Sequence, residues 1–227
     1  VYAVVDHSGF LGEAVEARAY LDDLHEVLGD TRRWHRQGGR KYERLPSALQ
    51  ELTSAYLDID DGDRSRFVEA VAGYGGWSPA AGSRAAGFLA GPGAGQVRQW
   101  WMEVSAKELD DLDLELARTS FVRLPVEGVG QEQLDDLNAR IGRGELFAYF
   151  VIGPDPVSGD EGCKYVSNNL TDRDLPQWYG RLATAEVRRR RIEREGLDHQ
   201  VAAWIQQHLS FDERKVGERG ADEEVAK

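Results

Sequence analysis

An uninterrupted apolar run, LFAYFVI, extends from Leu146 to Ile152. Such a run has no polar face to offer to solvent, and its length suits a strand that is buried on both sides. It is far shorter than the roughly 18 residues that a membrane-spanning helix needs. We therefore expect Phe147 to Ile152 to be the central strand of a sheet covered by helices, with Tyr149 and Phe150 pointing into opposite layers.

The residues before this run predict a strand and a helix. SFVRLPV, from Ser120 to Val126, is typical of a strand, and Leu134, Leu137 and Ile141 keep the spacing of one helix face. A strand, a helix and a second strand in this order form a right-handed crossover within one parallel sheet. The strand from Phe121 to Val126 should therefore lie in the same sheet as the apolar run.

The chain opens with another strand and helix. VYAVVDHS is apolar and β-branched as far as Asp6, and Gly9 then marks a turn. From Glu13 onward, apolar residues recur at steps of three and four, which predicts a helix that ends near Gly29.

Strand and helix signals also follow the apolar run. Lys164 to Ser167 should add a fourth strand to the sheet, and Phe211 to Val216 a short edge strand. Helical spacing predicts one helix with a buried face from Leu175 to Ile192 and a second from Val201 to His208.

Between these regions, residues 30–118 carry helical patterns cut by glycine and proline, as in YGGWSPAAG and GPGAG. The whole pattern predicts an α/β fold, with α+β as the alternative: a small mixed, partly parallel sheet flanked by helices and a large helical insertion. Residues 1–29 and 119–216 would form a discontinuous α/β core and residues 30–118 the insertion. The polar residues 217–227 would be a flexible tail.

Charge and cysteine content narrow the classes of partner. With 28 Lys and Arg against 40 Asp and Glu, the net charge is −12. An acidic chain repels the phosphates of nucleic acid, and its basic run, Arg188 to Arg191, is expected to form salt bridges within a helix. The single cysteine, Cys163, excludes an internal disulfide and any site built on several cysteines.

Two constellations resemble sites by composition. Asp6, His7 and Ser8 have the residue types of a catalytic triad, but on a strand Asp6 and Ser8 share one side while His7 points away. A polar strand end that caps the next helix is the favoured interpretation. The acidic segment from Asp58 to Asp63 lacks the glycine position of an EF-hand loop, which favours a helix end followed by an acidic cap.

No cofactor or metal is predicted. The glycines match neither the dinucleotide-binding nor the P-loop pattern. The five histidines form no pair with metal-ligand spacing. We therefore expect neither ATP hydrolysis nor a fold that depends on a chelatable metal.

Three tryptophans are the candidate contact residues: Trp77, Trp100 and Trp101. Neighbouring residues of a helix cannot both be buried equally, so one of Trp100 and Trp101 should be near the surface. An exposed indole beside the loop of Trp77 would suit a partner or ligand contact. The alternative is that all three pack inside the protein.

Three sequence blocks resemble a known family, the permeases of type 2 ABC exporters, and in particular the sodium-efflux-like branch. VYAVVDHSGFLGEAVEARAYL is similar to the segment that follows the first membrane helix in these permeases. LNARIGRGELFAYFVIGPDP, at Leu137 to Pro156, resembles their apolar strand, and KYVSNNLTDRDLPQWYGRLATAEVRRRRIE, at Lys164 to Glu193, resembles the block that follows it. The blocks cover about 110 residues, and the helical stretch departs from the family as an insertion.

The resemblance implies that the chain is the extracytoplasmic domain between two membrane helices of a permease, that it is not an enzyme, and that it is located at the cell membrane. Its partners would be the membrane helices of the same permease, a separate ATP-binding subunit in the cytoplasm and a second permease copy. The transported substrate would be sodium ion or a drug-like molecule. Both ends of the domain, Val1 and Val216, should then lie near each other.

Two other classes remain open from the residues alone. One is a free-standing module that binds a ligand or a protein, and the other is a hydrolase whose triad the sequence does not reveal. The insertion would distinguish this exporter from others, with any docking surface formed by Trp77 and one of Trp100 and Trp101.

Overall fold

The computed structural model describes residues 1–38, 40–74, 77–126, 128, 130–196, 212–216 and 222–224. The chain folds as two compact units. Residues 1–16 and 121–227 form the first, here called the sheet unit, and residues 17–120 form the second, here called the helical unit. Each is described by itself.

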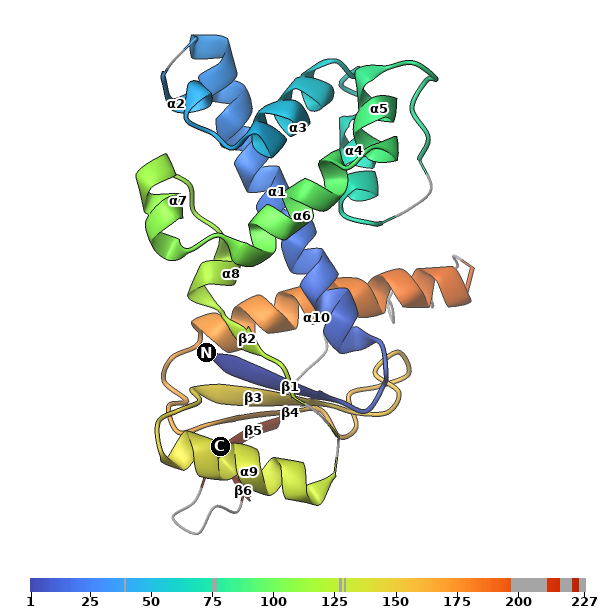
Figure 1. Ribbon diagram of the computed structural model, residues 1–227. Helices are drawn as coiled ribbons and strands as arrows, with labels where there is room; N and C mark the ends of the chain where they lie inside the picture. Colours follow the sequence, from blue (N-terminus) through green and yellow to red (C-terminus); the bar gives the residue numbers. More distant parts are fainter. Residues whose placement is uncertain are drawn as a thin grey trace. The chain divides into compact units, whose positions relative to one another are not determined.

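The sheet unit is built on a mixed sheet whose described strands have the order β2-β1-β3-β4-β5-β6 (Figure 1). β1 pairs in parallel with both β2 and β3, and β4 pairs in parallel with β5. The β3–β4 and β5–β6 pairs are antiparallel. This confirms the predicted α/β class with a small, partly parallel sheet. The strands are β1 (Tyr2–Asp6), β2 (Arg123–Leu124), β3 (Ala148–Ile152), β4 (Lys164–Ser167), β5 (Asp212–Val216) and β6 (Asp222–Glu224).

β3 is the central strand that the apolar run predicts, and all five of its residues are buried. α9 (Gln131–Gly142) covers one face of the sheet and α10 (Asp174–Arg194) the other (Figure 1). Tyr149 packs with the residues of α9 and donates a hydrogen bond from its hydroxyl to Asn138 Oδ1 at 2.8 Å. Phe150 faces the other layer, where its ring stacks on Tyr179 of α10 at a centroid distance of 4.0 Å. The prediction that these two side chains enter opposite layers is confirmed.

The outer strands differ from the sequence prediction. The strand expected over residues 121–126 is reduced to the two residues of β2, because Pro125 has no N–H to donate to a ladder and is tolerated at a sheet edge. β5 is not an edge strand, since β6 pairs with its outer side. β6 lies within residues 217–227, so this stretch is not wholly the flexible tail that its polar composition predicts. The helix predicted over Val201 to His208 lies outside the described residues.

α1 (Leu11–Gln37) is longer than expected and crosses from the sheet unit into the helical unit. The predicted end at Gly29 is wrong, because the buried face continues through Leu28, Thr31 and Trp34. Gly38 has a φ of 61°, the left-handed conformation that commonly follows the last residue of a helix. The insertion therefore begins at Ala17, inside α1, rather than at residue 30, and ends at Ser120.

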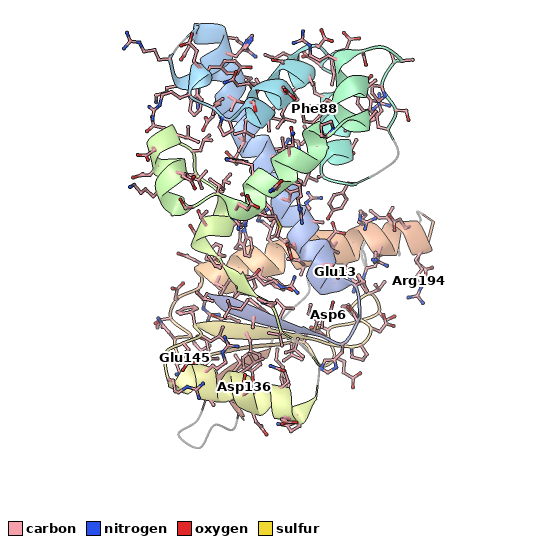
Figure 2. The ribbon with its side chains drawn as sticks, in the orientation of Figure 1. Asp6, Glu13, Phe88, Asp136, Glu145 and Arg194 are labelled. Atoms are coloured by element: carbon pink, nitrogen blue, oxygen red, sulfur yellow. The ribbon has the colours of Figure 1, made fainter. Side chains whose placement is uncertain are left out.

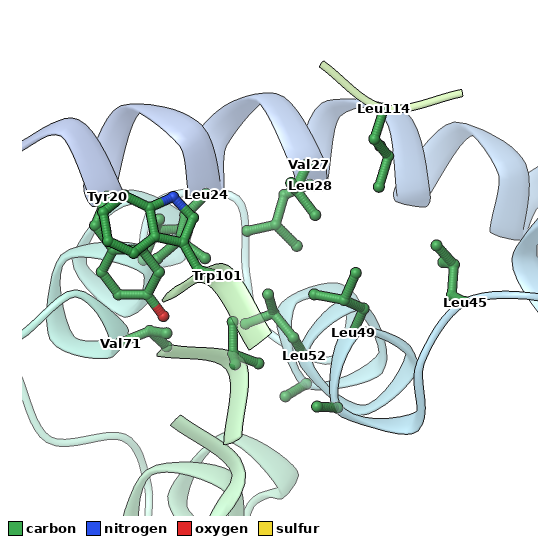
Figure 3. Close-up of a cluster of buried hydrophobic side chains, with 14 of the residues drawn as sticks. Tyr20, Leu24, Val27, Leu28, Leu45, Leu49, Leu52, Val71, Trp101 and Leu114 are labelled. Atoms are coloured by element: carbon green, nitrogen blue, oxygen red, sulfur yellow. The ribbon is translucent and has the colours of Figure 1, made fainter. Parts of the chain in front are cut away.

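The helical unit contains most of α1 and seven further described helices. Figure 3 shows part of its hydrophobic core. Tyr20, Leu24 and Leu28 of α1 line one side of this core. Leu49 and Leu52, which follow Pro46, are fully buried within it. The further helices are α2 (Arg40–Glu43), α3 (Ser47–Leu57), α4 (Arg64–Val71), α5 (Arg84–Ala90), α6 (Gly93–Glu103), α7 (Ala106–Leu112) and α8 (Ala117–Ser120).

Candidate functional site

The end of β1 forms a capping turn for α1 (Figure 2). Asp6 Oδ2 accepts a hydrogen bond from Gly12 N at 2.8 Å, and Oδ1 accepts from the backbone N and the hydroxyl of Ser8 at 2.9 and 2.6 Å. The Ser8 hydroxyl oxygen in turn accepts from Leu11 N at 3.1 Å. These groups satisfy the free N–H groups at the start of α1.

His7 takes no part in this turn. Its side chain is exposed, while Asp6 and Ser8 contact each other through the turn that follows β1, which ends at Asp6. Its backbone N donates to Ile152 O at 3.1 Å and so continues the pairing of β1 with β3. The three residues form a capping turn, because the carboxylate and the hydroxyl are engaged with each other and with backbone groups rather than with an imidazole.

Arg123 of β2 anchors the first turns of α1. Its Nη1 donates to Gly12 O at 2.9 Å and lies 3.2 Å from Glu16 Oε2. A Cβ on Gly12 would lie 3.2 Å from both the Arg123 guanidinium and Asp6 Oδ2, so glycine is the residue that lets these groups approach the helix.

The loop that follows β3 is closed on itself around Cys163. A Cβ on Gly153 would lie only 2.0 Å from the carbonyl oxygen of Glu161. The two sides of this loop are therefore too close for any side chain at this position. The Cys163 sulfur accepts a hydrogen bond from Gly153 N at 3.4 Å. Burial raises the pKa of the Cys163 thiol, which disfavours the thiolate that a nucleophile or metal ligand requires.

Val1, which precedes β1, and Val216, which ends β5, both lie at the opposite end of the sheet. Val1 precedes β1 and accepts a hydrogen bond at its carbonyl from Phe147 N at 3.0 Å. A hollow of about 320 Å³ lies here, lined by Val1, Leu146, Phe147 and the two asparagines at 168 and 169, among others. Val1 itself is 50% exposed.

The register places Val216 at this same end. Tyr2 is opposite Ala148, and Ala148 is opposite Ser167. Because β5 runs parallel to β4, Val216 at the end of β5 lies at the same end of the sheet as Ser167 at the end of β4. Val1 and Val216 are thus separated by three strand spacings, or roughly 14 Å across the sheet. The expectation that they lie near each other agrees with this register.

Trp101 is buried in the core of the helical unit, with 3% of its surface exposed. Its indole N–H donates to Asp23 Oδ2 at 2.8 Å, and Asp23 Oδ1 accepts from Ala117 N at 3.0 Å. Burial raises the pKa of Asp23, while these hydrogen bonds lower it. Trp101 therefore joins α6 to α1 and is not available as a contact residue.

Trp77 and Trp100 are half-buried against the same core. Trp77 meets the ring of Phe67 edge-on at 6.1 Å. The expectation that the neighbouring tryptophans differ in burial is confirmed, with Trp101 as the inner one. A partner contact through Trp77 and Trp100 stays a prediction.

Charged residues of the acidic segment at 58–63 and of the basic run at 188–191 form ion pairs within the chain. Arg64 and Arg66 pair with Asp61 and Asp63 of the acidic segment that composition likens to a calcium loop. Among the described residues, no group of three or more His, Cys, Asp or Glu side chains is placed to hold a metal ion. In the basic run of α10, Arg189 pairs with Glu186 at 3.0 Å and with Glu193.

Comparison with family models, characterised proteins and solved structures found no match to this chain. No helix in the described part of the chain has the length and apolar character needed to cross a membrane.

Proposed function

We propose that this chain is the extracytoplasmic domain of a type 2 ABC exporter permease of the sodium-efflux-like branch, inserted between two membrane helices. It is a non-catalytic part of the export machinery for sodium ion or a drug-like substrate. Its partners are the membrane helices of the same permease, a separate ATP-binding subunit on the cytoplasmic side and a second permease copy.

The observation that carries the proposal is where the three family-like blocks fall. The first block forms β1 and the beginning of α1, the second ends α9 and forms β3, and the third forms β4 and α10. β1, β3 and β4 are adjacent in the sheet. The strands of the three family-like blocks are thus neighbours in the sheet unit, while most of the helical unit comes from the stretch without a counterpart.

The positions of Val1 and Val216 add support. Two membrane helices that flank a domain require its ends to leave from one side, and the register gives a separation of roughly 14 Å. Rocking of these helices would then be transmitted to the sheet through both ends.

Cysteine labelling of the full-length gene product in intact cells tests the proposal. The native Cys163 is buried and serves as the unreactive background, whereas Met102 is 48% exposed and accepts a Met102→Cys substitution. A membrane-impermeant maleimide should label M102C above the level of the native protein, and this added labelling should be as strong in intact cells as after permeabilisation. The product should also stay in the membrane fraction through an alkaline carbonate wash.

Labelling only after permeabilisation would place the domain on the cytoplasmic side and contradict the proposal. Release by the carbonate wash would favour the alternative of a free-standing binding module.

A further inference from the structure

The helical unit contains a groove of about 620 Å³ that no part of the proposed function uses. It lies between the end of α1, α2, α3 and the α5–α6 turn, all within one unit. The volume falls within the range of roughly 300–1,000 Å³ that is typical of small-molecule sites. Its lining combines aromatic, charged and glycine residues.

The aromatic part of the groove is preformed. The Tyr42 hydroxyl donates to Gln50 O at 2.9 Å and lies 3.3 Å from Ser54 Oγ, and the His35 ring meets Tyr42 edge-on at 4.8 Å. Phe88 of α5, which is labelled in Figure 2, is buried, with 7% of its surface exposed. A Cβ on Gly93 would lie 2.5 Å from the Phe88 ring, so glycine allows the ring to rest against the backbone of α6. An apolar ligand group would meet surfaces that need little rearrangement.

Charges of both signs line the same groove. Arg84, at the start of α5, and Glu51, on α3, are exposed, and neither side chain has a hydrogen bond or ion pair with any described residue. Arg64 and Arg66 of the same unit, by contrast, pair with neighbouring aspartates. An open guanidinium and an open carboxylate beside aromatic rings are complementary to a ligand that carries an anion, a cation and an apolar body.

We propose that this groove binds a small zwitterionic molecule with an apolar body, of the short-peptide class. The apolar side chains of the ligand pack on Phe88 and Tyr42. Its carboxylate pairs with Arg84 and its ammonium group with Glu51. This inference does not depend on the export function, because it uses only residues of the helical unit.

Binding of the dipeptide Leu-Phe to the 227-residue chain, followed by calorimetry or NMR titration, tests the inference. We expect a Kd below about 1 mM for Leu-Phe, which carries both charges. The blocked form, N-acetyl-Leu-Phe-amide, has the same apolar groups without the charges and should bind about tenfold more weakly or worse. Glu51→Gln and Arg84→Gln should each weaken Leu-Phe binding by about tenfold and leave the Tm unchanged.

Two glycine substitutions separate binding from folding. A Cβ on Gly87 of α5 meets nothing within 4 Å, so Gly87→Leu extends into the groove without a clash of its first atom. Gly95 of α6 has equally open surroundings but does not line the groove, which makes Gly95→Leu the matched control. Both variants replace a helical glycine and should keep or raise the Tm. Only G87L should lose Leu-Phe binding.

The inference is overturned if Leu-Phe does not bind the native chain, if the blocked dipeptide binds equally well, or if G87L binds like G95L. Should G87L lower the Tm, the decision passes to E51Q and R84Q, which alter only exposed charges. Unchanged binding in both of these variants would also overturn it.

Discussion

Trp100 and Trp101 are neighbours in α6 with opposite environments. Trp101 donates its N–H to the buried Asp23, and the guanidinium groups of Arg98 and Arg118 lie 4.7 and 5.2 Å from its ring centroid. Trp101→Ala would leave a cavity and an unpaired acceptor on Asp23. We expect it to lower the free energy of unfolding by about 3–5 kcal/mol.

Trp100→Ala is the matched control for that change. Trp100 is half-buried, so its removal should cost about 1 kcal/mol or less. Urea unfolding of both variants, followed by far-UV circular dichroism, measures the difference. Equal losses in the two variants would contradict the assignment of Trp101 as the inner residue.

Single residues were predictable where their local geometry decides. The interpretation of Asp6 and Ser8 as a polar strand end that caps the next helix is confirmed, although β1 ends at Asp6 and the two side chains meet through a turn rather than through strand alternation. The same approach failed on α10, where Ile192 is 48% exposed and Arg191 is buried. The Arg191 Nε donates to Val157 O at 2.7 Å, a contact over 34 positions of sequence, and such a distant partner leaves no trace in the helical spacing.

Gly153 shows how a whole loop can depend on one missing side chain. The loop between β3 and β4 folds back so closely that a Cβ at this position would overlap Glu161 O, 2.0 Å away. Gly153→Ala must therefore separate the two sides of the loop and disturb the Gly153 N to Cys163 Sγ hydrogen bond. We expect a loss of about 1–3 kcal/mol of unfolding free energy.

Gly159→Ala, in the same loop, has nothing within 4 Å of its added Cβ. It should leave the stability within about 0.5 kcal/mol of the native value. Thermal unfolding of the two variants side by side provides the measurement, and a native-like Tm for G153A would refute the close approach.

Elements with a strong pattern were predicted well, and their boundaries less so. β3, β4 and α9 were anticipated because apolar runs and helical spacing depend on burial alone. α1 was expected to end at Gly29, but a glycine ends a helix only where the backbone becomes left-handed, which happens at Gly38. The capping box of Ser105 and Glu108 that begins α7 is readable in the sequence and was missed.

The helical unit is inserted into the sheet unit at two points that are close in space. The chain leaves the sheet unit after Glu16 and returns at Phe121. Arg123, two residues after the return, contacts both Glu16 and the carbonyl of Gly12. Sequence composition indicated such an insertion, but its start inside a continuous helix could not be read from periodicity, because the spacing of apolar residues does not change at Ala17.

This arrangement predicts that the sheet unit folds without residues 17–120. A Gly/Ser linker of about six residues reaches about 20 Å when extended, which is sufficient to join two segments whose side chains already touch. The sheet unit retains its central strand and the Asp6 cap of the shortened α1. It also retains the aromatic layer on α10, in which Tyr179 stacks on Phe150 of β3 and the ring of Trp178 lies beside that of Tyr179. We expect the deletion variant to unfold in one cooperative step, with a lower Tm than the native chain because α1 is cut to its first turns.

Near-UV circular dichroism from Trp178 and Tyr179, whose ring centroids lie 6.5 Å apart, reports whether the aromatic layer is packed. A variant that lacks this signal, or that is digested at protease concentrations that leave the native chain intact, would show that the sheet unit requires the insertion to fold.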